Sequence, residues 1–265
     1  MRRNSTRAYI ANLVASPGAI PFALLITAWI LIPLFINVPP YALPKIEDVF
    51  GQVVLGIQDG SLPRDILDSL ERLLLGFCIG NAFAIPLGIA IALNRRISCL
   101  LIPVLTFLQS IGGIAWVPLA VLWLGIGPGA VLFVIANQIF FSSVYNTVNG
   151  VRTIPLALHR AILCHGARGV QILSELVLPG ALIQILVGLR TSMAYGWRAL
   201  VAAEMIAGTN GIGFRMIEAV QWYQTDTVLI GMIVIGVIWV LMDWLVFSKL
   251  EQITVVRWGL LREVA

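Results

Sequence analysis

The chain has 265 residues, of which 59% are hydrophobic and 11% charged, and its mean hydropathy is +0.95. Soluble domains carry about a quarter of their residues as charged side chains, so this composition excludes an ordinary soluble protein and predicts an integral membrane protein. The formal net charge of +4 does not indicate nucleic acid as a partner, because the cations lie in loops between apolar segments, where membrane orientation explains them better.

The amino-terminal part begins with a polar segment, residues 1–16, that resembles the basic start of a signal peptide. The apolar run 17–38 that follows approaches the ~20 residues that span a bilayer and is longer than a cleavable signal core. We therefore interpret 17–38 as the first transmembrane helix and 1–16 as a cytoplasmic segment. An outer loop rich in proline extends to residue 65, and within it 46–58 favours an interfacial helix.

Five more apolar segments complete a prediction of six transmembrane helices. They cover about 68–93 (with 68–75 as a lead-in), 100–124, 130–148, 181–203 and 227–247, and a tail, 248–265, follows. Cytoplasmic loops are enriched in Lys and Arg, so the cations place both termini and the 152–170 segment in the cytoplasm. The cations on that side are Arg2, Arg3, Arg7, Arg95, Arg96, Arg152, Arg160, Arg168, Lys249, Arg257 and Arg262, against Lys45, Arg64, Arg72 and Arg215 outside.

Polar residues inside these spans have two interpretations that the sequence leaves open. Such residues are costly in a bilayer and usually face the bundle interior or a water-filled path, but they also join helices by hydrogen bonds and close packing. Arg198 has a third possibility, reaching the outer surface or pairing with a carboxylate, and we expect Glu204, at the membrane edge, to be a structural or gating partner. The candidates for a path along the third, fourth and fifth spans are Gln109, Ser110, Gly112, Gly113, Asn137, Gln138, Arg198 and Glu204.

Two local patterns refine this interpretation. Gly112-Gly113 followed by Pro118 weakens the third span, and a weakened helix is tolerated only where it lines a cavity or packs on protein. Asn81, Ser142 and Ser143 favour the other role, hydrogen bonding between helices.

The polar interruption 152–170 predicts a helix, a glycine stop and a second helix. Pro155 suits the first turn of a short helix, because its missing N–H is unpaired there in any case. Gly166 suits a left-handed helix end. The run from Val170 to Leu178 predicts the second helix, which Pro179 can kink. A helical elbow at a membrane boundary is a shape that can dock against another protein.

The same residues carry a family resemblance. Gly166-Ala167, Val177-Leu178-Pro179 and Gly188-Leu189-Arg190 resemble the EAA loop of ABC importer permeases, with the departure that Arg160-Ala161-Ile162 stands where that family has Glu-Ala-Ala. Further segments in the family's order resemble its nitrate/taurine/sulfonate subgroup, with Ile111-Gly112-Gly113 where that subgroup often has a proline. These segments are Ser69-Leu70-Glu71-Arg72 with Gly76-Phe77, Ala115-Trp116-Val117-Pro118-Leu119, Leu122 to Gly127, Leu200 to Met205 with Gly211-Ile212-Gly213, and Thr254 to Gly259.

The resemblance implies an all-α type I (MetI-like) importer permease whose permease domain covers 66–247. It implies a homodimer in the bilayer, two cytoplasmic ABC ATPase subunits that hold ATP and Mg, and an external solute-binding protein. It also implies alternating access for a small anion such as nitrate, bicarbonate, taurine or another sulfonate. The residues it places at the ATPase joint are Arg160, Ala161, Gly166, Ala167, Leu178 and Pro179.

Several chemistries are not encoded. The sequence has no G-x-x-x-x-G-K-[ST] loop, so ATP hydrolysis by that route must belong to a partner. His159 and His165 are six residues apart, off the helical spacing of a metal site, and the three cysteines form no C-x-x-C pair. We therefore expect no catalytic or metal site. A non-transporting membrane scaffold or sensor, or a self-sufficient channel, remains as an alternative to an importer.

Overall fold

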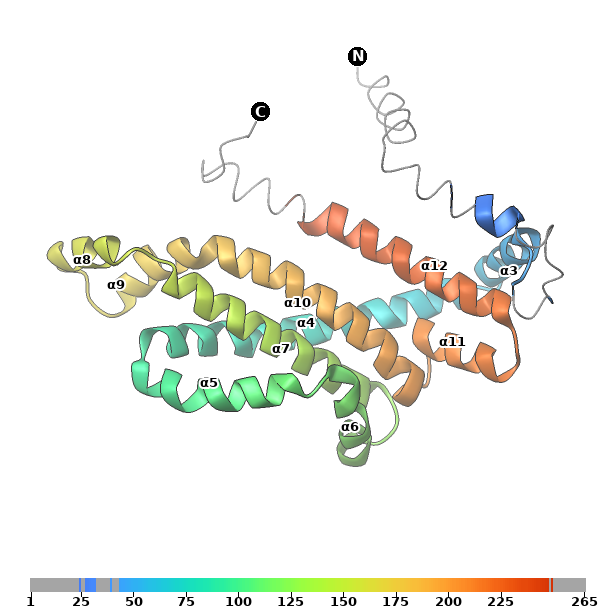
Figure 1. Ribbon diagram of the computed structural model, residues 1–265, viewed down its shortest axis with the longest axis horizontal. Coiled ribbons are helices and arrows are strands. Elements are labelled where there is room, and N and C mark those ends of the chain that lie inside the picture. The colour runs from blue at the N-terminus through green and yellow to red at the C-terminus, as the bar shows by residue number, and fades with distance from the viewer. Residues whose placement is uncertain (1–23, 25–26, 32–38, 40–42, 248, 250–265) are drawn as a thin grey trace, which may run out of the picture.

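The computed structural model describes residues 24, 27–31, 39, 43–247 and 249, and every regular element in this part of the chain is a helix (Figure 1). The predicted segment 1–16, most of the predicted first span 17–38 and nearly all of the tail 248–265 lie outside these residues. The elements are α3 (Ile46–Gln58), α4 (Ser61–Leu93), α5 (Arg95–Ser110), the 3₁₀-helix η1 (Gly113–Trp116), α6 (Val117–Leu124), α7 (Pro128–Arg152), α8 (Leu156–Cys164), α9 (Val170–Ile172), the π-helix η2 (Leu173–Val177), α10 (Leu178–Ala207), α11 (Ile212–Gln221), α12 (Thr225–Met242) and the π-helix η3 (Asp243–Phe247).

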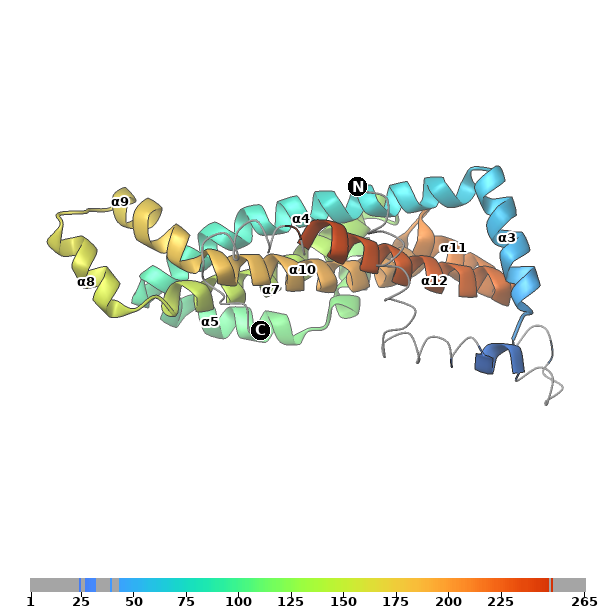
Figure 2. The ribbon, with the colours of Figure 1, turned by 90° about the horizontal axis from the view of Figure 1, so that it is seen from above.

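Helices α4, α7 and α10 form the core of the bundle and run side by side along its long axis (Figures 1 and 2). Helix α7 lies between the other two and approaches both at glycines. A Cβ atom at Gly80 of α4 would lie 2.8 Å from the backbone oxygen of Ala136, and one at Gly188 of α10 would lie 2.6 Å from the Cβ of Asn146. Small residues let membrane helices approach closely and gain packing contacts, so these glycines set the spacing of the core.

Polar side chains between the core helices are paired. The Ser143 hydroxyl on α7 donates to Asn81 Oδ1 on α4 at 2.5 Å, and Asn146 Nδ2 donates to the Thr191 hydroxyl on α10 at 3.3 Å. The predicted structural role of Asn81 and Ser143 is thereby confirmed. Ser142 is buried as well, and its carbonyl accepts from Asn146 Nδ2 at 2.8 Å.

The third predicted span, 100–124, is broken at the point where Gly112-Gly113 and Pro118 predicted a weakened helix. Helix α5 begins earlier, at Arg95, where the Asn94 side chain accepts from two backbone N–H groups, and it ends at Ser110. The chain then bends by 92° into η1 and α6. The bend follows from Gly112, which leaves the helix in an extended conformation, and from Pro118, which is well placed only in the first turn of a new helix.

Four helices of the described residues are long and apolar enough to cross a membrane, or five if the bent α5–α6 pair is one span. They are Ser61–Leu93, Pro128–Arg152, Val170–Ala207 and Thr225–Phe247, and each contains all or nearly all of a predicted span. The predicted helix 46–58 is confirmed as α3. The segment between the predicted spans 181–203 and 227–247, however, holds the ten-residue helix α11 (Ile212–Gln221).

The two ends of the bundle differ in what covers them. Figure 1 shows α8 and α9 beyond one end of the core helices, whereas α3 and α11 lie at the opposite end. We refer to these as the α8 end and the α11 end. Helix α3 contacts α4 and α12, and α11 contacts α10, α12 and α4. The residues singled out by the sequence are therefore distributed over both ends and the core between them.

Candidate functional site

A fully buried carboxylate organises the α11 end. Glu204 has no solvent-exposed surface, although the sequence placed it at the membrane edge. Arg72 Nη1 of α4 donates to its Oε1 at 2.6 Å, the Ser69 hydroxyl lies 2.9 Å from both carboxylate oxygens, and the Gly213 N–H donates to Oε2 at 3.0 Å. A buried charge is tolerated when it is paired and hydrogen-bonded. Glu204 meets this condition and joins α10 to α4 and α11.

The same cluster holds the loop that connects α10 to α11. Arg72 donates to the carbonyl of Asn210 at 2.9 Å and to its side-chain oxygen, and Asn210 Nδ2 donates to Asp68. The Ile212 N–H donates to the Ser69 hydroxyl at 3.0 Å. We call Ser69, Arg72, Glu204 and Asn210 the outer latch. It fixes the start of α11 by bonds to the backbone as well as to side chains.

Glycine is required where the connecting loop passes the carboxylate. Gly211 has φ +104, a region that L-residues rarely adopt, and a Cβ there would lie 2.5 Å from Glu204 Oε1. The Gly-x-Gly turn of the sequence is therefore the part of the loop that closes over the outer latch. Any side chain at Gly211 would meet the buried charge.

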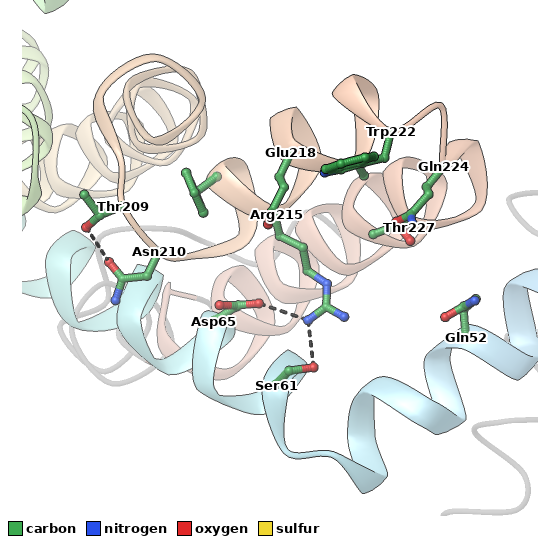
Figure 3. A pocket seen from close by; sticks show the side chains of 12 residues that line it. Gln52, Ser61, Asp65, Thr209, Asn210, Arg215, Glu218, Trp222, Gln224 and Thr227 are labelled. Atoms are coloured by element: carbon green, nitrogen blue, oxygen red, sulfur yellow. Dashed lines mark hydrogen bonds and ion pairs between the residues drawn. The ribbon is translucent and has the colours of Figure 1, made fainter.

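A polar cavity of about 560 Å³ opens beside the outer latch (Figure 3). In its floor Arg215 Nη1 lies 3.0 Å from Asp65 Oδ2 and 3.0 Å from the Ser61 hydroxyl. Figure 3 shows Glu218 of α11 and Trp222, the residue after this helix, together on the other side of the cavity, and both are exposed. The remaining lining residues are Gln52, Thr209, Asn210, Phe214, Ala219, Gln224 and Thr227. The cavity thus joins α3, α4 and α11 in one accessible surface.

The opposite end carries the α8 joint, defined as residues 152–170. No residue of α8 is buried, and the predicted Arg160 and Ala161 are exposed. Gly166 ends the helix with φ +84 and donates to the Leu163 carbonyl at 3.0 Å, which confirms the predicted left-handed stop. Ala167 turns back into the protein and is 9% exposed. The joint is therefore a helix held at its two ends and free along its length.

The connection from the α8 joint to α10 contains a π-helical turn. The predicted second helix from Val170 is present, but Leu173–Val177 is η2, and Leu178 and Pro179 begin α10. Pro179 has no N–H, and its ring crowds the carbonyl of residue 175, which lies within η2. Such π-turns recur at functional sites inside helices. Here η2 lets the helix pass Pro179 without ending.

The predicted path residues divide into two groups. Gly113 and Gln138 are in contact, since a Cβ at Gly113 would lie 2.8 Å from Gln138 Cδ. Asn137 Oδ1, next to Gln138 on α7, is buried and has no hydrogen-bond partner within the described part of the chain. Gly112, Gln109 and Ser110 are exposed at the bend after α5. Arg198 is exposed on α10, with its guanidinium 5.8 Å from the ring centre of Tyr195.

Two indole N–H donors near this region are also buried. Trp116 Nε1 of η1 and Trp197 Nε1 of α10 have no hydrogen-bond partner among the residues that the structure describes. The elements η1 and α10 contact each other, and each also contacts α7, the helix that carries Asn137. Unpaired buried polar groups are rare in native structures and call for an explanation.

The outer latch was predicted only in part, because Glu204 was expected to be a structural or gating partner but Ser69 and Arg72 were not expected to pair with it. On sequence alone, Ser69 and Arg72 were assigned to a segment that resembles the family, and Arg72 was placed among the cations outside the membrane. In the structure Arg72 is only 8% exposed and faces the bundle. The spacing of three residues between Ser69 and Arg72 puts both on one face of a helix. An arginine and a serine on the face of an apolar helix, with a carboxylate in another apolar helix, is the signal that predicts such a pair.

The geometry can now be set beside known proteins. The family model described as "Binding-protein-dependent transport system inner membrane component" matches residues 84–247. The chain is 35% identical over 228 residues to the taurine transport system permease protein of Escherichia coli, covering 83% of this chain and 82% of that protein. It is 34% identical over 186 residues to the bicarbonate transport system permease protein of Synechococcus elongatus, covering 70% and 67%.

A solved structure supports the fold. The chain in a structure titled as inward-facing conformations of the MetNI methionine ABC transporter matches this chain with a TM-score of 0.51 at 18% identity. The match covers 71% of this chain and 95% of that one. At this identity the likeness bears on the arrangement of helices only.

Proposed function

We propose a mode of action for this chain from the premise that it belongs to the family of binding-protein-dependent transport system inner membrane components. It is a multi-pass membrane protein and a permease subunit of an ABC importer, as are its relatives named for taurine and bicarbonate transport. Its family is one of transport permeases and not of enzymes. Different residues of the chain couple it to an ATPase, line the solute path and dock a solute-binding protein.

We infer that α8 is the element that contacts a separate cytoplasmic ATPase. The observation that carries this proposal is that α8 is wholly unburied and projects beyond the core helices, while Gly166 and η2 tie it to α10 (Figure 1). Arg160 and Ala161 then face the ATPase, Gly166 and Ala167 form the turn, and Leu178 and Pro179 pass movement to α10. ATP and Mg belong to the partner.

The topology proposed with this role has six spans with both termini in the cytoplasm. Residues 1–16 form the cytoplasmic start, 17–65 the first span and outer loop, 66–247 the permease domain and 248–265 the cytoplasmic tail. The α8 end then faces the cytoplasm and the α11 end faces outward. The cations of the α8 end, which include Arg95, Arg96 and Arg160, agree with this orientation.

The proposed solute is a small anion such as nitrate, bicarbonate, taurine or another sulfonate. The names of the relatives support this class. The path runs past Gly112 and Gly113 at the bend after α5 and then along α7 and α10. Its polar side chains are Gln109, Ser110, Asn137, Gln138 and Arg198. Unpaired buried donors such as Trp116 Nε1 and Trp197 Nε1 suit an oxyanion once the helices part to expose them.

A homodimer and an external solute-binding protein complete the proposal. The cavity of Figure 3 opens at the α11 end, where such a protein would dock. Its exposed Glu218 and Trp222 offer a carboxylate and an aromatic face to a basic side chain of the docked protein. The outer latch lies next to this surface and is suited to transmit docking to α4 and α10 as a gating element.

Reconstitution tests the proposal. The purified chain is placed in liposomes with the ATPase and binding protein that co-purify with it, and uptake of labelled taurine and bicarbonate is measured with and without ATP. We expect uptake only with ATP and the binding protein, and ATP hydrolysis that rises when the loaded binding protein is added. Passive conduction by the chain alone would support a channel instead. Failure of any nucleotide hydrolase to co-purify would contradict the coupling role of α8.

A further inference from the structure

An apolar groove of about 620 Å³ lies at the α8 end, between the last turns of α4 and the segment that begins at Gly169. Ile85, Ile89 and Leu93 of α4 recur every four residues and therefore form one stripe along the helix. Leu93 is 53% exposed and Val170, on the opposite wall, is 77% exposed, so the groove is open along its length. The other lining residues are Pro86, Ala90, Gly169, Leu173 and Leu178.

Cations adjoin the groove at its α8 end. Arg95 and Arg96 follow Leu93 at the start of α5, and Arg168 precedes Gly169 and Val170, so three lining residues have a basic neighbour within two positions in the sequence. All three arginines are exposed. The sequence contains no Asp or Glu between Glu71 and Glu175. The groove therefore combines an uncharged apolar wall with a basic mouth.

We propose that this groove binds an acyl chain of an anionic phospholipid and that Arg95, Arg96 and Arg168 bind its phosphate. Burial of each CH₂ group of a chain is favourable. Basic pockets between membrane helices at the membrane surface are suited to anionic head groups, which zwitterionic lipids match less well. The stripe lies on α4, which is long and apolar enough to span the membrane, so the lipid's chain and head group meet the wall and the mouth in the right order.

A bound lipid would act on the α8 joint, because the second wall of the groove is formed by elements that connect this joint to the core. Leu173 belongs to η2 and Leu178 begins α10, which are the elements that connect the α8 joint to the core. Ile85, Ile89 and Leu173 already pack against one buried cluster beneath the groove, and an acyl chain in the groove would add contacts to both walls. The bound lipid would thus stabilise one position of the α8 joint. Lipid binding itself depends neither on the transported solute nor on the ATPase.

Native mass spectrometry of the purified full chain tests the site. The delipidated protein is titrated with phosphatidylglycerol or with phosphatidylcholine of the same acyl chains. We expect phosphatidylglycerol to be retained at a concentration at least about fivefold lower, the effect of roughly one favourable arginine contact. Arg95→Gln with Arg168→Gln should bring phosphatidylglycerol close to phosphatidylcholine, and Ile89→Trp, which fills the groove, should weaken retention of both lipids.

Matched variants control for charge and for bulk. Arg64→Gln removes an exposed arginine at the α11 end, and Ile79→Trp adds the same bulk to an exposed position of α4 outside the groove. Both should retain phosphatidylglycerol as the unmodified chain does. Equal retention of the two lipids by the unmodified chain would overturn the proposal. Labelling by a photoactivatable phosphatidylglycerol of peptides outside 85–96 and 168–178 would also overturn it. Cross-links from Ile89→Cys to the amino-terminal segment 1–16, or to a second copy of the chain, would do the same.

Discussion

At the α11 end the outer latch buries the charges it uses, whereas at the α8 end no residue of the helix Leu156–Cys164 is buried. Both regions are short polar interruptions between apolar helices. Glu204 is held by Ser69, Arg72 and the backbone of Gly213, so its helix, a neighbouring helix and a loop share one cluster. The α8 joint continues from the end of α7, where Arg152 donates to the Ser98 hydroxyl at 2.6 Å, and it connects to α10 through the turn at Gly166 and through η2.

The difference indicates which end can move by itself. A buried ion pair ties its elements together because removing either partner leaves an uncompensated charge. An exposed helix on a glycine turn has no such tie, so it can take its position from a partner. The α11 end therefore reorganises as one unit, while the α8 joint follows whatever it binds. The predictions below separate these two behaviours.

The largest effect is expected from breaking the outer latch. Glu204→Gln leaves the Arg72 guanidinium buried without its counter-charge, and we expect a loss of about 3–5 kcal/mol in the free energy of unfolding. Thermal unfolding of the purified chain in detergent measures this. Arg72→Met combined with Glu204→Leu removes both charges and should recover part of the loss. An unfolding temperature for Glu204→Gln equal to that of the unmodified chain would show that the pair is not buried.

A smaller effect should separate the glycines of the two ends. Gly211 and Gly166 both have positive φ, so alanine at either position costs about 1–3 kcal/mol of backbone strain. Only at Gly211 does the new Cβ also meet Glu204 Oε1, whereas nothing lies within 4 Å at Gly166. We therefore expect Gly211→Ala to lower the unfolding temperature clearly more than Gly166→Ala. Equal shifts in unfolding temperature would mean that the loop between α10 and α11 moves to accommodate the new Cβ without loss of stability.

Function at the α8 joint should be lost while the core helices stay folded. Gly166→Pro forces φ to about −65° and removes the N–H that bonds to Leu163. We expect uptake to fall roughly tenfold or more, the scale of a typical coupling free energy, while the chain still inserts in the membrane. The ratio of solute uptake to ATP hydrolysis in liposomes measures the coupling. Uptake by Gly166→Pro at the level of Gly166→Ala would count against the joint.

The parts of the fold that sequence predicts well are those that depend on local chemistry. The length of apolar runs predicted the helices around 130–148 and 227–247, and the glycine at 166 predicted its turn. Gly112 and Pro118 predicted a weak point, but the 92° bend was not predicted, because local residues show where a helix ends and not where the next one points. Helix α11 was missed although its buried Ile212, Met216 and Ala219 have helical spacing.

The outer latch was hard to predict because its members are far apart in the chain. Arg72 and Glu204 are 132 residues apart, and the register between α4 and α10 decides whether they meet. That register depends on packing against α7 at glycines such as Gly76 and Gly196, which contact Ile135 and Ile139. Sequence patterns give the face of each helix but not its offset along a neighbour. A tie between helices therefore needs the structure, whereas a turn does not.

A second ion pair gives the finest test of the comparison. Arg190 Nη2 lies 2.6 Å from Asp243 Oδ2, the same distance that separates Arg72 from Glu204, but the Arg190–Asp243 side chains are 44% and 27% exposed against 9% and 0%. An exposed charge within a membrane helix is tolerated where it faces water, so we expect this pair to lie on a hydrated face of the permease. Its coupling energy should then be about 0–1 kcal/mol and should fall with added salt. Double-mutant cycles on both pairs, followed by thermal unfolding at low and high salt, compare them directly. A coupling energy for Arg190–Asp243 as large as that of the outer latch would mean that a partner or a second copy covers this face, and burial would no longer distinguish the two pairs.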